Sequence, residues 1–203
     1  MVEKLKQEYN VDVEWRPFYL YFDTALHRTY LAKFSDAGNA VRCKCTPPEG
    51  RELPEHVKRA RASGSEERLK QIADQYGLSF KSTQRIYNTR LAHEGTEYAR
   101  EHGKGIEFHR ALFRRVYAEG GDPSQWNVLR ATAEEVGLDV DEMQAQVESG
   151  KYTGIVEDQV KFAYQMGVTG VPTYVINERY AIVGAQPYEV FKSALGQILK
   201  QES

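Results

Sequence analysis

The feature of this sequence that most constrains its fold is a change of pattern near residue 167. Residues 54–166 carry an almost unbroken series of helix patterns, in which apolar side chains recur every three or four positions and glycines mark several ends. Residues 173–183 then predict two short strands joined by a tight turn, and residues 187–201 predict a terminal helix. A helical block followed by strand, turn, strand and helix indicates an α/β protein.

The residues before this block predict less. Residues 1–9 have helical spacing, and residues 11–16 alternate apolar and polar side chains, which predicts a strand. Residues 46–50, with two prolines and a glycine, predict a loop. Residues 19–45 match no regular element apart from an aromatic, strand-like run at 19–22. The expected order is therefore helix, strand, helical block, and then strand, strand and helix.

Composition and charge argue against several classes of protein. The 203-residue chain has a net charge of −2, which favours neither a nucleic-acid partner nor an acidic membrane surface. No apolar run reaches the length that spans a bilayer, and the N-terminus lacks the apolar segment of a secretory signal. The only cysteines are Cys43 and Cys45, too few for a disulfide-stapled secreted scaffold, so a cytoplasmic location is expected.

Residues 167–195, GVTGVPTYVINERYAIVGAQPYEVFKSAL, resemble the C-terminal part of DsbA-like thioredoxin domains. They are most similar to the FrnE-like branch of that family, which neighbours the 2-hydroxychromene-2-carboxylate isomerase and kappa-class glutathione transferase branch. Residues 13–18, 46–50 and 88–113 also match this branch, in the same order along the chain. The whole resemblance covers two ranges, 1–18 and 46–203.

The resemblance implies an α/β, thioredoxin-like fold with a large all-helical inserted domain. In that fold a mixed sheet carries helices on both faces. The expected division has three parts: residues 1–52 and 158–203 as the thioredoxin-like domain, residues 53–157 as the helical insertion domain, and residues 19–45 as an atypical insert within the first.

The family pattern also differs from this sequence at its start. In the family, a first strand and a Cys-x-x-Cys motif precede the segment that begins here at Val2, so the chain is expected to be truncated before that motif. A sheet without its first strand leaves backbone groups unpaired, which is costly when they are buried. We therefore expect the aromatic run 19–22 to take the place of the absent strand, or the chain to be a marginally stable fragment.

By the same resemblance, Gly170, Val171, Pro172 and Thr173 form a substrate-facing loop with a cis Val171–Pro172 bond. Such a loop presents the backbone N–H and carbonyl of Val171 outward, where an extended peptide or the cysteine of glutathione can pair with them. Gln186 lies before the terminal helix, where glutathione-binding relatives hold the γ-glutamyl carboxylate. Gln186 therefore either contributes to such a site or serves only as a helix cap.

Redox chemistry needs a thiolate, which family members stabilise at a helix N-terminus. Neither Cys43 nor Cys45 occupies such a position in the sequence pattern. In an extended strand their Cα atoms lie about 6–7 Å apart, which is near the upper limit for a disulfide and makes a bond between them strained and easily reduced. They are candidates for a redox pair, but two inert thiols in a surface insert is the favoured interpretation.

A zinc site is another alternative, and its candidate ligands are His27, Cys43, Cys45 and His56. Their spacing matches no common zinc pattern, so no metal is expected. Among the other histidines, His109 is expected to pack in a half-buried position. No resident cofactor is expected, and glutathione is the alternative co-substrate.

The resemblance implies a DsbA-like thiol-disulfide oxidoreductase, impaired or inactive in this chain because the Cys-x-x-Cys motif is absent. Two alternatives stay open: a glutathione-dependent isomerase- or transferase-like protein, and a non-catalytic module that binds peptides or thiols at the Val171 groove. The expected partner is a thiol- or disulfide-bearing protein or peptide, or glutathione, with no nucleic acid and no membrane. The chain is expected to be a monomer or a homodimer.

Overall fold

The structure is a computed structural model that describes residues 2–9, 11–17, 46–47 and 49–202. The chain groups into two compact units: a sheet unit (residues 1–20 and 158–203) and a helical unit (residues 21–157). The division expected from the sequence, with residues 53–157 as an insertion, stays a prediction. Among the described residues, none of the helices combines the length and the apolar character needed to span a lipid bilayer.

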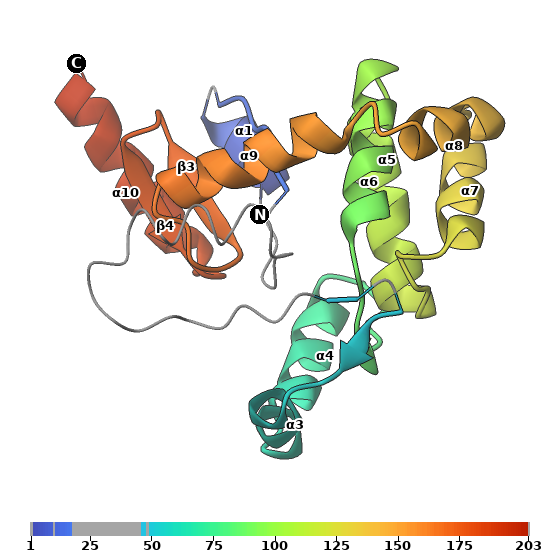
Figure 1. Cartoon of the computed structure of the whole chain (residues 1–203). Helices are drawn as coiled ribbons and strands as arrows, with labels where there is room; N and C mark the ends of the chain where they lie inside the picture. Colours follow the sequence, from blue (N-terminus) through green and yellow to red (C-terminus); the bar gives the residue numbers. More distant parts are fainter. Residues whose placement is uncertain (1, 10, 18–45, 48, 203) are drawn as a thin grey trace, which may run out of the picture. The chain divides into compact units, whose positions relative to one another are not determined.

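The core of the helical unit lies among helices packed side by side (Figure 1). These helices are α5 (Arg90–Glu101), α6 (Gly105–Arg114), α7 (Trp126–Glu135) and α8 (Val140–Glu148); Tyr152, just before α9 (Thr153–Gln165), also belongs to their core. Each buries one face because its apolar residues recur every three or four positions. The largest fully buried side chains include Tyr98, Phe108, Leu129, Met143 and Tyr152.

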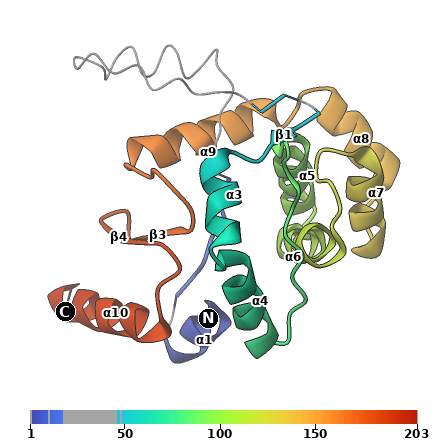
Figure 2. The same cartoon turned by 90° about the horizontal axis from the view of Figure 1, so that it is seen from below.

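Two further helices of this unit, α3 (Glu55–Ala62) and α4 (Ser65–Gln75), form a pair that follows the short strand β1 (Arg51–Glu52) (Figure 2). Neither α3 nor α4 buries a residue. β1 pairs antiparallel with β2 (Arg85–Ile86), a ladder that the sequence pattern does not predict. Gly50, with a φ of +75°, is required beside it, because a Cβ there would lie 2.7 Å from a backbone oxygen of β2.

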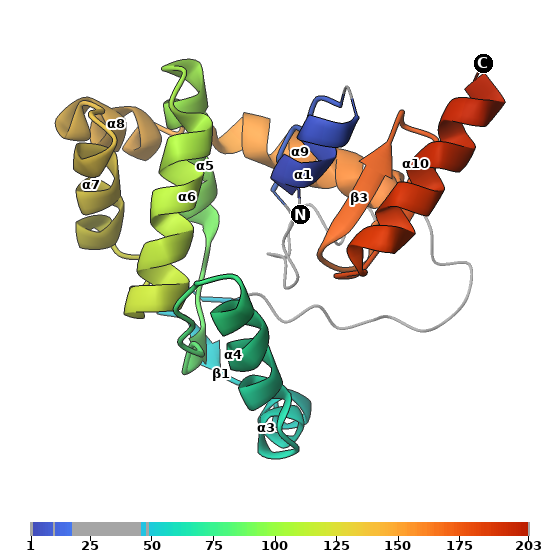
Figure 3. The ribbon, with the colours of Figure 1, turned by 180° about the vertical axis from the view of Figure 1, so that it is seen from behind.

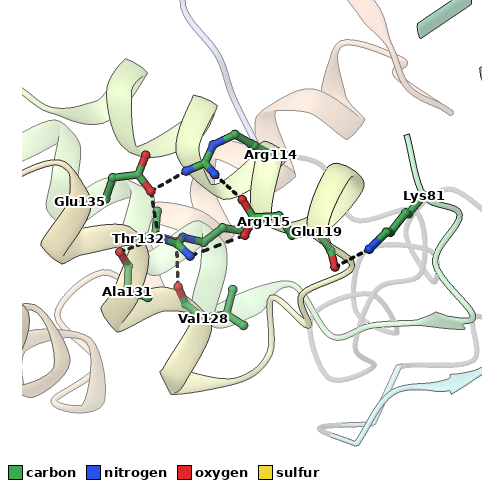
Figure 4. Close-up of polar contacts among 8 residues, drawn as sticks. All are labelled: Lys81, Arg114, Arg115, Glu119, Val128, Ala131, Thr132 and Glu135. Carbon is green, nitrogen blue, oxygen red and sulfur yellow. Dashed lines mark hydrogen bonds and ion pairs between the residues drawn. The ribbon is translucent and has the colours of Figure 1, made fainter. Parts of the chain in front are cut away.

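The end of α6 continues as a π-helical turn, η1 (Arg115–Glu119). Arg114 and Arg115 each contact two carboxylates, Glu119 near the end of the same helix and Glu135 on α7 (Figure 4). The distances to the Glu135 carboxylate are 2.6 Å from Arg114 Nη2 and 2.8 Å from Arg115 Nη2. Guanidinium groups shared between two carboxylates fix η1 against α7 in one geometry.

The sheet unit is built around a two-stranded antiparallel sheet (Figure 3). Its complete elements are α1 (Val2–Glu8), β3 (Thr173–Ile176), β4 (Tyr180–Val183) and α10 (Tyr188–Glu202). Leu5, Phe191 and Leu195 form its buried cluster, against which residues of both strands pack. The Tyr174 ring meets the Phe191 ring edge to face, with centroids 4.7 Å apart. The strand, turn, strand and helix predicted for this region are confirmed.

The strand predicted at residues 11–16 is wrong, because residues 11–17 belong to no helix or strand. Alternation of apolar and polar side chains requires only that the two sides of the chain differ, whereas a strand also needs a hydrogen-bonded neighbour. The replacement strand expected at 19–22, with the rest of the insert 19–45, lies outside the described residues.

Candidate functional site

The loop that carries the sequence-predicted site joins α9 to β3. At the end of α9 the Val168 N–H donates to the Ala163 carbonyl at 3.0 Å. Gly167, which lies inside the turn closed by this bond, has a φ of +75°. This left-handed conformation commonly closes helix C-termini. The chain therefore leaves α9 in a defined direction before it enters β3.

The Val171–Pro172 peptide bond is cis, and both side chains are exposed, with 52% of the Val171 surface accessible. The loop is held on both sides: the Thr173 hydroxyl donates to the Gly170 carbonyl at 2.7 Å, and the Gly184 N–H donates to the Pro172 carbonyl at 2.8 Å. Among the residues that the structure describes, none is hydrogen-bonded to the Val171 backbone. The four predicted loop residues thus lie together at the surface.

Gln186 lies on the connection from β4 to α10. Its side-chain nitrogen donates to the Val183 carbonyl at 2.9 Å, and its backbone N–H donates to the Gly184 carbonyl at 3.0 Å. Because the Gly184 N–H is bonded to Pro172, this turn is one hydrogen bond away from the loop. The amide nitrogen of Gln186 is engaged in closing the turn, and its contact with glutathione stays a prediction.

The two faces of the β3–β4 sheet differ in exposure. Tyr174 packs into the core, whereas Val175 and Val183 are 40% and 60% exposed. The register pairs Thr173 with Val183 and Val175 with Ala181, so these residues share the outer face. The loop at 170–173 carries no acid, base or thiol. This arrangement can therefore hold an extended or apolar segment, while any bond-breaking chemistry needs a group from elsewhere.

Of the cysteine and metal candidates, only His56 belongs to the described residues, where it is exposed on α3. Cys43, Cys45 and His27 lie outside them. Within the described ranges, no three His, Cys, Asp or Glu side chains gather closely enough to hold a metal ion. The cysteine pair stays a prediction.

Sequence reasoning missed a buried carboxylate in the helical unit. Glu94 on α5 is 3% exposed, and it accepts hydrogen bonds from Arg90 Nε at 3.0 Å and from the Thr153 hydroxyl at 2.8 Å. These contacts tie α5 to the first residue of α9. The four-residue spacing of Arg90 and Glu94 is visible in the sequence and predicts an ion pair, but it does not predict the burial.

Two histidines on α5 and α6 have lowered pKa values. Burial, with a smaller contribution from His109, lowers the pKa of His93 to about 4. Burial, followed by the charge of Arg100, also lowers the pKa of His109. His109 is half-buried and stacks on Phe113 with ring centroids 4.4 Å apart, which confirms its expected packing role. Both histidines are neutral at neutral pH and add no charge to the unit.

The family model for the DSBA-like thioredoxin domain matches residues 1–196. The chain is also 32% identical over 115 residues to the uncharacterized protein YwbO of Bacillus subtilis strain 168, a match that covers 56% of this chain and 57% of YwbO. It is 35% identical over 82 residues to a 2-hydroxychromene-2-carboxylate isomerase of Sphingobium xenophagum, covering 40% of this chain and 42% of the isomerase. The matches span about half the length of these curated relatives.

Two solved structures superpose on most of this chain. A 2-hydroxychromene-2-carboxylate isomerase superposes with a TM-score of 0.69 at 22% identity, covering 99% of this chain and 88% of its own. A probable DsbA oxidoreductase from Streptomyces coelicolor superposes with a TM-score of 0.63 at 30% identity, covering 72% and 63%. These similarities confirm the α/β fold class expected from the sequence.

Proposed function

Because this chain belongs to the DSBA-like thioredoxin domain family and has its fold, we propose that the exposed Val171 loop docks a thiol- or disulfide-bearing peptide. The proposed reaction class of the complete site is thiol-disulfide exchange, as in an oxidoreductase. The similarity to a probable DsbA oxidoreductase at 30% identity supports this class. The family works without a resident cofactor, and glutathione enters the proposal only as an alternative co-substrate.

The observation that carries the proposal is the surface at Val171. The Val171 side chain is apolar and 52% exposed, and no described residue is hydrogen-bonded to the Val171 N–H or carbonyl. An extended peptide can satisfy that N–H and carbonyl as an added strand would, while its side chains contact the outer face of β3 and β4. The contacts from Thr173 and Gly184 hold the loop in place before a substrate arrives. Preorganisation of this kind lowers the entropic cost of binding.

The redox step is a separate part of the proposal. The two cysteines of this sequence, Cys43 and Cys45, are separated by a single residue and do not form a Cys-x-x-Cys motif. A low-pKa thiolate at a helix N-terminus is the group that normally attacks a substrate disulfide. We therefore propose that this 203-residue chain by itself docks substrates without turning them over.

Calorimetric titration with a short extended peptide, whose central cysteine is a mixed disulfide with glutathione, tests the docking loop. Val171→Asp places a charge at the centre of the contact, and we expect it to weaken binding by about tenfold or more. Val190→Asp is the matched control, since Val190 is 42% exposed on α10 of the same unit. Equal affinity of the two variants, or no binding to the unaltered chain, would contradict the proposal.

Insulin reduction tests the statement about turnover. With dithiothreitol as the reductant, the chain is expected to precipitate insulin no faster than dithiothreitol alone. Acceleration that is lost in Cys43→Ser or Cys45→Ser would show instead that these thiols form a working redox pair.

A glutathione-dependent isomerase is the second candidate, favoured by the similarity to 2-hydroxychromene-2-carboxylate isomerase at 35% identity. In that case Gln186, one hydrogen bond from the loop, would contact the γ-glutamyl carboxylate. Calorimetry with reduced glutathione distinguishes this candidate. Saturable binding that Gln186→Ala weakens supports it, and the absence of binding by free glutathione, with the peptide disulfide still bound, rules it out.

A further inference from the structure

A cavity of about 450 Å³ opens on the helical unit, and none of its lining residues belongs to the Val171 loop. Its lining includes Glu66 and Lys70 from α4 and, from the segment that leads to β2, Phe80, Lys81, Ser82 and Thr83. The volume is within the range of small-molecule sites. We propose that this cavity binds a small aromatic phosphate, meaning a planar ring that bears a phosphate group. This site is independent of the docking loop proposed above.

The aromatic wall of the cavity is fixed from behind. The Phe80 ring lies nearly parallel to the Tyr117 ring, with an interplanar angle of 9° and centroids 6.4 Å apart. Tyr117 also contacts Phe113, with centroids 5.4 Å apart, so Phe80 is the cavity-side member of an aromatic row. The Lys81 N–H donates to the Tyr117 carbonyl at 2.5 Å. A ring supported in this way can stack on a planar ligand with little loss of side-chain entropy.

The π-helical turn η1 fixes the position of the Phe80 ring, because the neighbouring Lys81 is hydrogen-bonded to this turn. Arg114 and Arg115 are committed to Glu119 and Glu135, which fixes η1 against α7 (Figure 4). The Lys81 ammonium reaches the Glu119 carbonyl at 3.3 Å, so both the backbone and the side chain of Lys81 rest on this turn. The two arginines therefore shape the cavity from outside it and do not take part in binding.

The polar groups of the lining match a phosphate better than a carboxylate. Lys70 and Lys81 supply two ammonium groups, and Ser82 and Thr83 supply two hydroxyl donors. Glu66, the carboxylate in this lining, lies 3.8 Å from the Lys70 ammonium and partly offsets its charge. The Lys81 ammonium contacts a neutral carbonyl, that of Glu119, rather than a carboxylate. A phosphate monoester carries up to two negative charges and three acceptor oxygens, which uses these donors more completely than the two oxygens of a carboxylate.

Calorimetry with 1-naphthyl phosphate and with adenosine monophosphate tests the proposal. Comparing the two affinities shows whether the cavity prefers a simple aryl phosphate or a nucleotide. Inorganic phosphate, adenosine and 1-naphthoate serve as partial ligands that lack the ring, the phosphate or the second charge. Each partial ligand is expected to bind at least about tenfold more weakly than the aromatic phosphate, since each gives up one charged or stacking contact. Binding of 1-naphthoate as tightly as 1-naphthyl phosphate would overturn the assignment to phosphate.

Variants locate the site. Lys81→Met is expected to weaken 1-naphthyl phosphate binding by about tenfold, and Lys70→Gln by about threefold because its charge is already partly offset. Lys104→Gln, an exposed lysine of the same unit outside the cavity, is the control and should leave the affinity unchanged. Circular dichroism verifies that each variant is folded. Unchanged affinity in both Lys70→Gln and Lys81→Met, or no saturable binding of either aromatic phosphate, would overturn the proposal.

Discussion

The helical unit and the sheet unit bury their side chains to different degrees. In the helical unit Phe108, Leu129 and Met143 are fully buried, and a buried carboxylate joins α5 to α9. The buried cluster described in the sheet unit is smaller, and Val175 and Val183 of its sheet stay open to solvent. Exposed apolar surface beside a held loop is typical of a binding surface, whereas a closed core is typical of a framework.

Exposed apolar side chains also occur in the helical unit, Leu69 and Leu78 among them, and the proposed docking function uses those beside the Val171 loop. Docking at Val171 would cover apolar surface that the sheet unit leaves exposed, so binding and stability are coupled there. The helical unit gains little from covering its core further, and its proposed cavity relies on charge and stacking. Substitutions in the two units should therefore have distinguishable effects.

The largest expected effect comes from the core of the helical unit. Phe108→Ala removes a fully buried ring and should lower the free energy of unfolding by about 3–5 kcal/mol. Phe191→Ala makes the corresponding cavity in the sheet unit, where Phe191 is 2% exposed. Amide hydrogen exchange should show lost protection within the altered unit only. Simultaneous loss of protection in both units, from either variant, would show that the two units do not unfold separately.

The ion pair between the buried Glu94 and the half-exposed Arg90 should have the second largest effect. Glu94→Ala removes the acceptor for Arg90 and Thr153 and should cost about 2 kcal/mol in urea unfolding, a value reduced because Arg90 is half exposed. Glu157→Ala is the control, since Glu157 lies 3.9 Å from the same guanidinium and is more exposed. Its cost should stay below about 0.5 kcal/mol. Equal costs would mean that burial adds nothing to this contact.

Elements that depend on contacts between residues close in sequence were predicted correctly, whereas features that depend on contacts between distant residues were not. Helices were predictable because their apolar spacing and terminal glycines are local signals. The strand expected at 11–16 failed because pairing requires a neighbour that the local pattern cannot specify. The charge of Glu94 was visible and its burial was not. The proposed cavity joins Lys70 and Lys81 to a row that ends at Phe113, contacts that no sequence spacing brings together.

Acid should test the helical unit through His93. The pKa of His93 is lowered from its ordinary value of 6.5 to about 4 in the folded state. Between pH 6.5 and about 4 the unfolded chain therefore binds more protons than the folded chain. Above pH 6.5 His93 is neutral in both states and its titration does not change the free energy of unfolding. As the pH drops from 6.5 toward 4, only the unfolded chain is protonated at this histidine, so the free energy of unfolding falls. We expect a loss on the order of 1–2 kcal/mol over this window, discounted for partial exposure. Urea unfolding of His93→Gln should lack this dependence, and a dependence that persists unchanged would assign it to another group.

The smallest effect concerns one helix cap. The Asp139 carboxylate accepts a hydrogen bond from the Glu142 N–H at 2.8 Å at the start of α8. Asp139→Ala should lower the free energy of unfolding by about 1 kcal/mol. Asp141→Ala changes a side chain that is 88% exposed and should lower it by less than about 0.5 kcal/mol. Thermal unfolding of both variants measures the difference. A larger cost for Asp141→Ala would contradict the capping role.

The proposed function rests on the docking of substrates on the sheet unit at the Val171 loop. Its most direct test is a titration of the ¹⁵N-labelled chain with the glutathione mixed-disulfide peptide, followed by amide chemical shifts. We expect the largest shifts at Gly170, Val171, Thr173 and Val175, with the amides of α5–α8 unchanged. Saturating peptide that shifts the helical unit most, or leaves the loop amides in place, would contradict it.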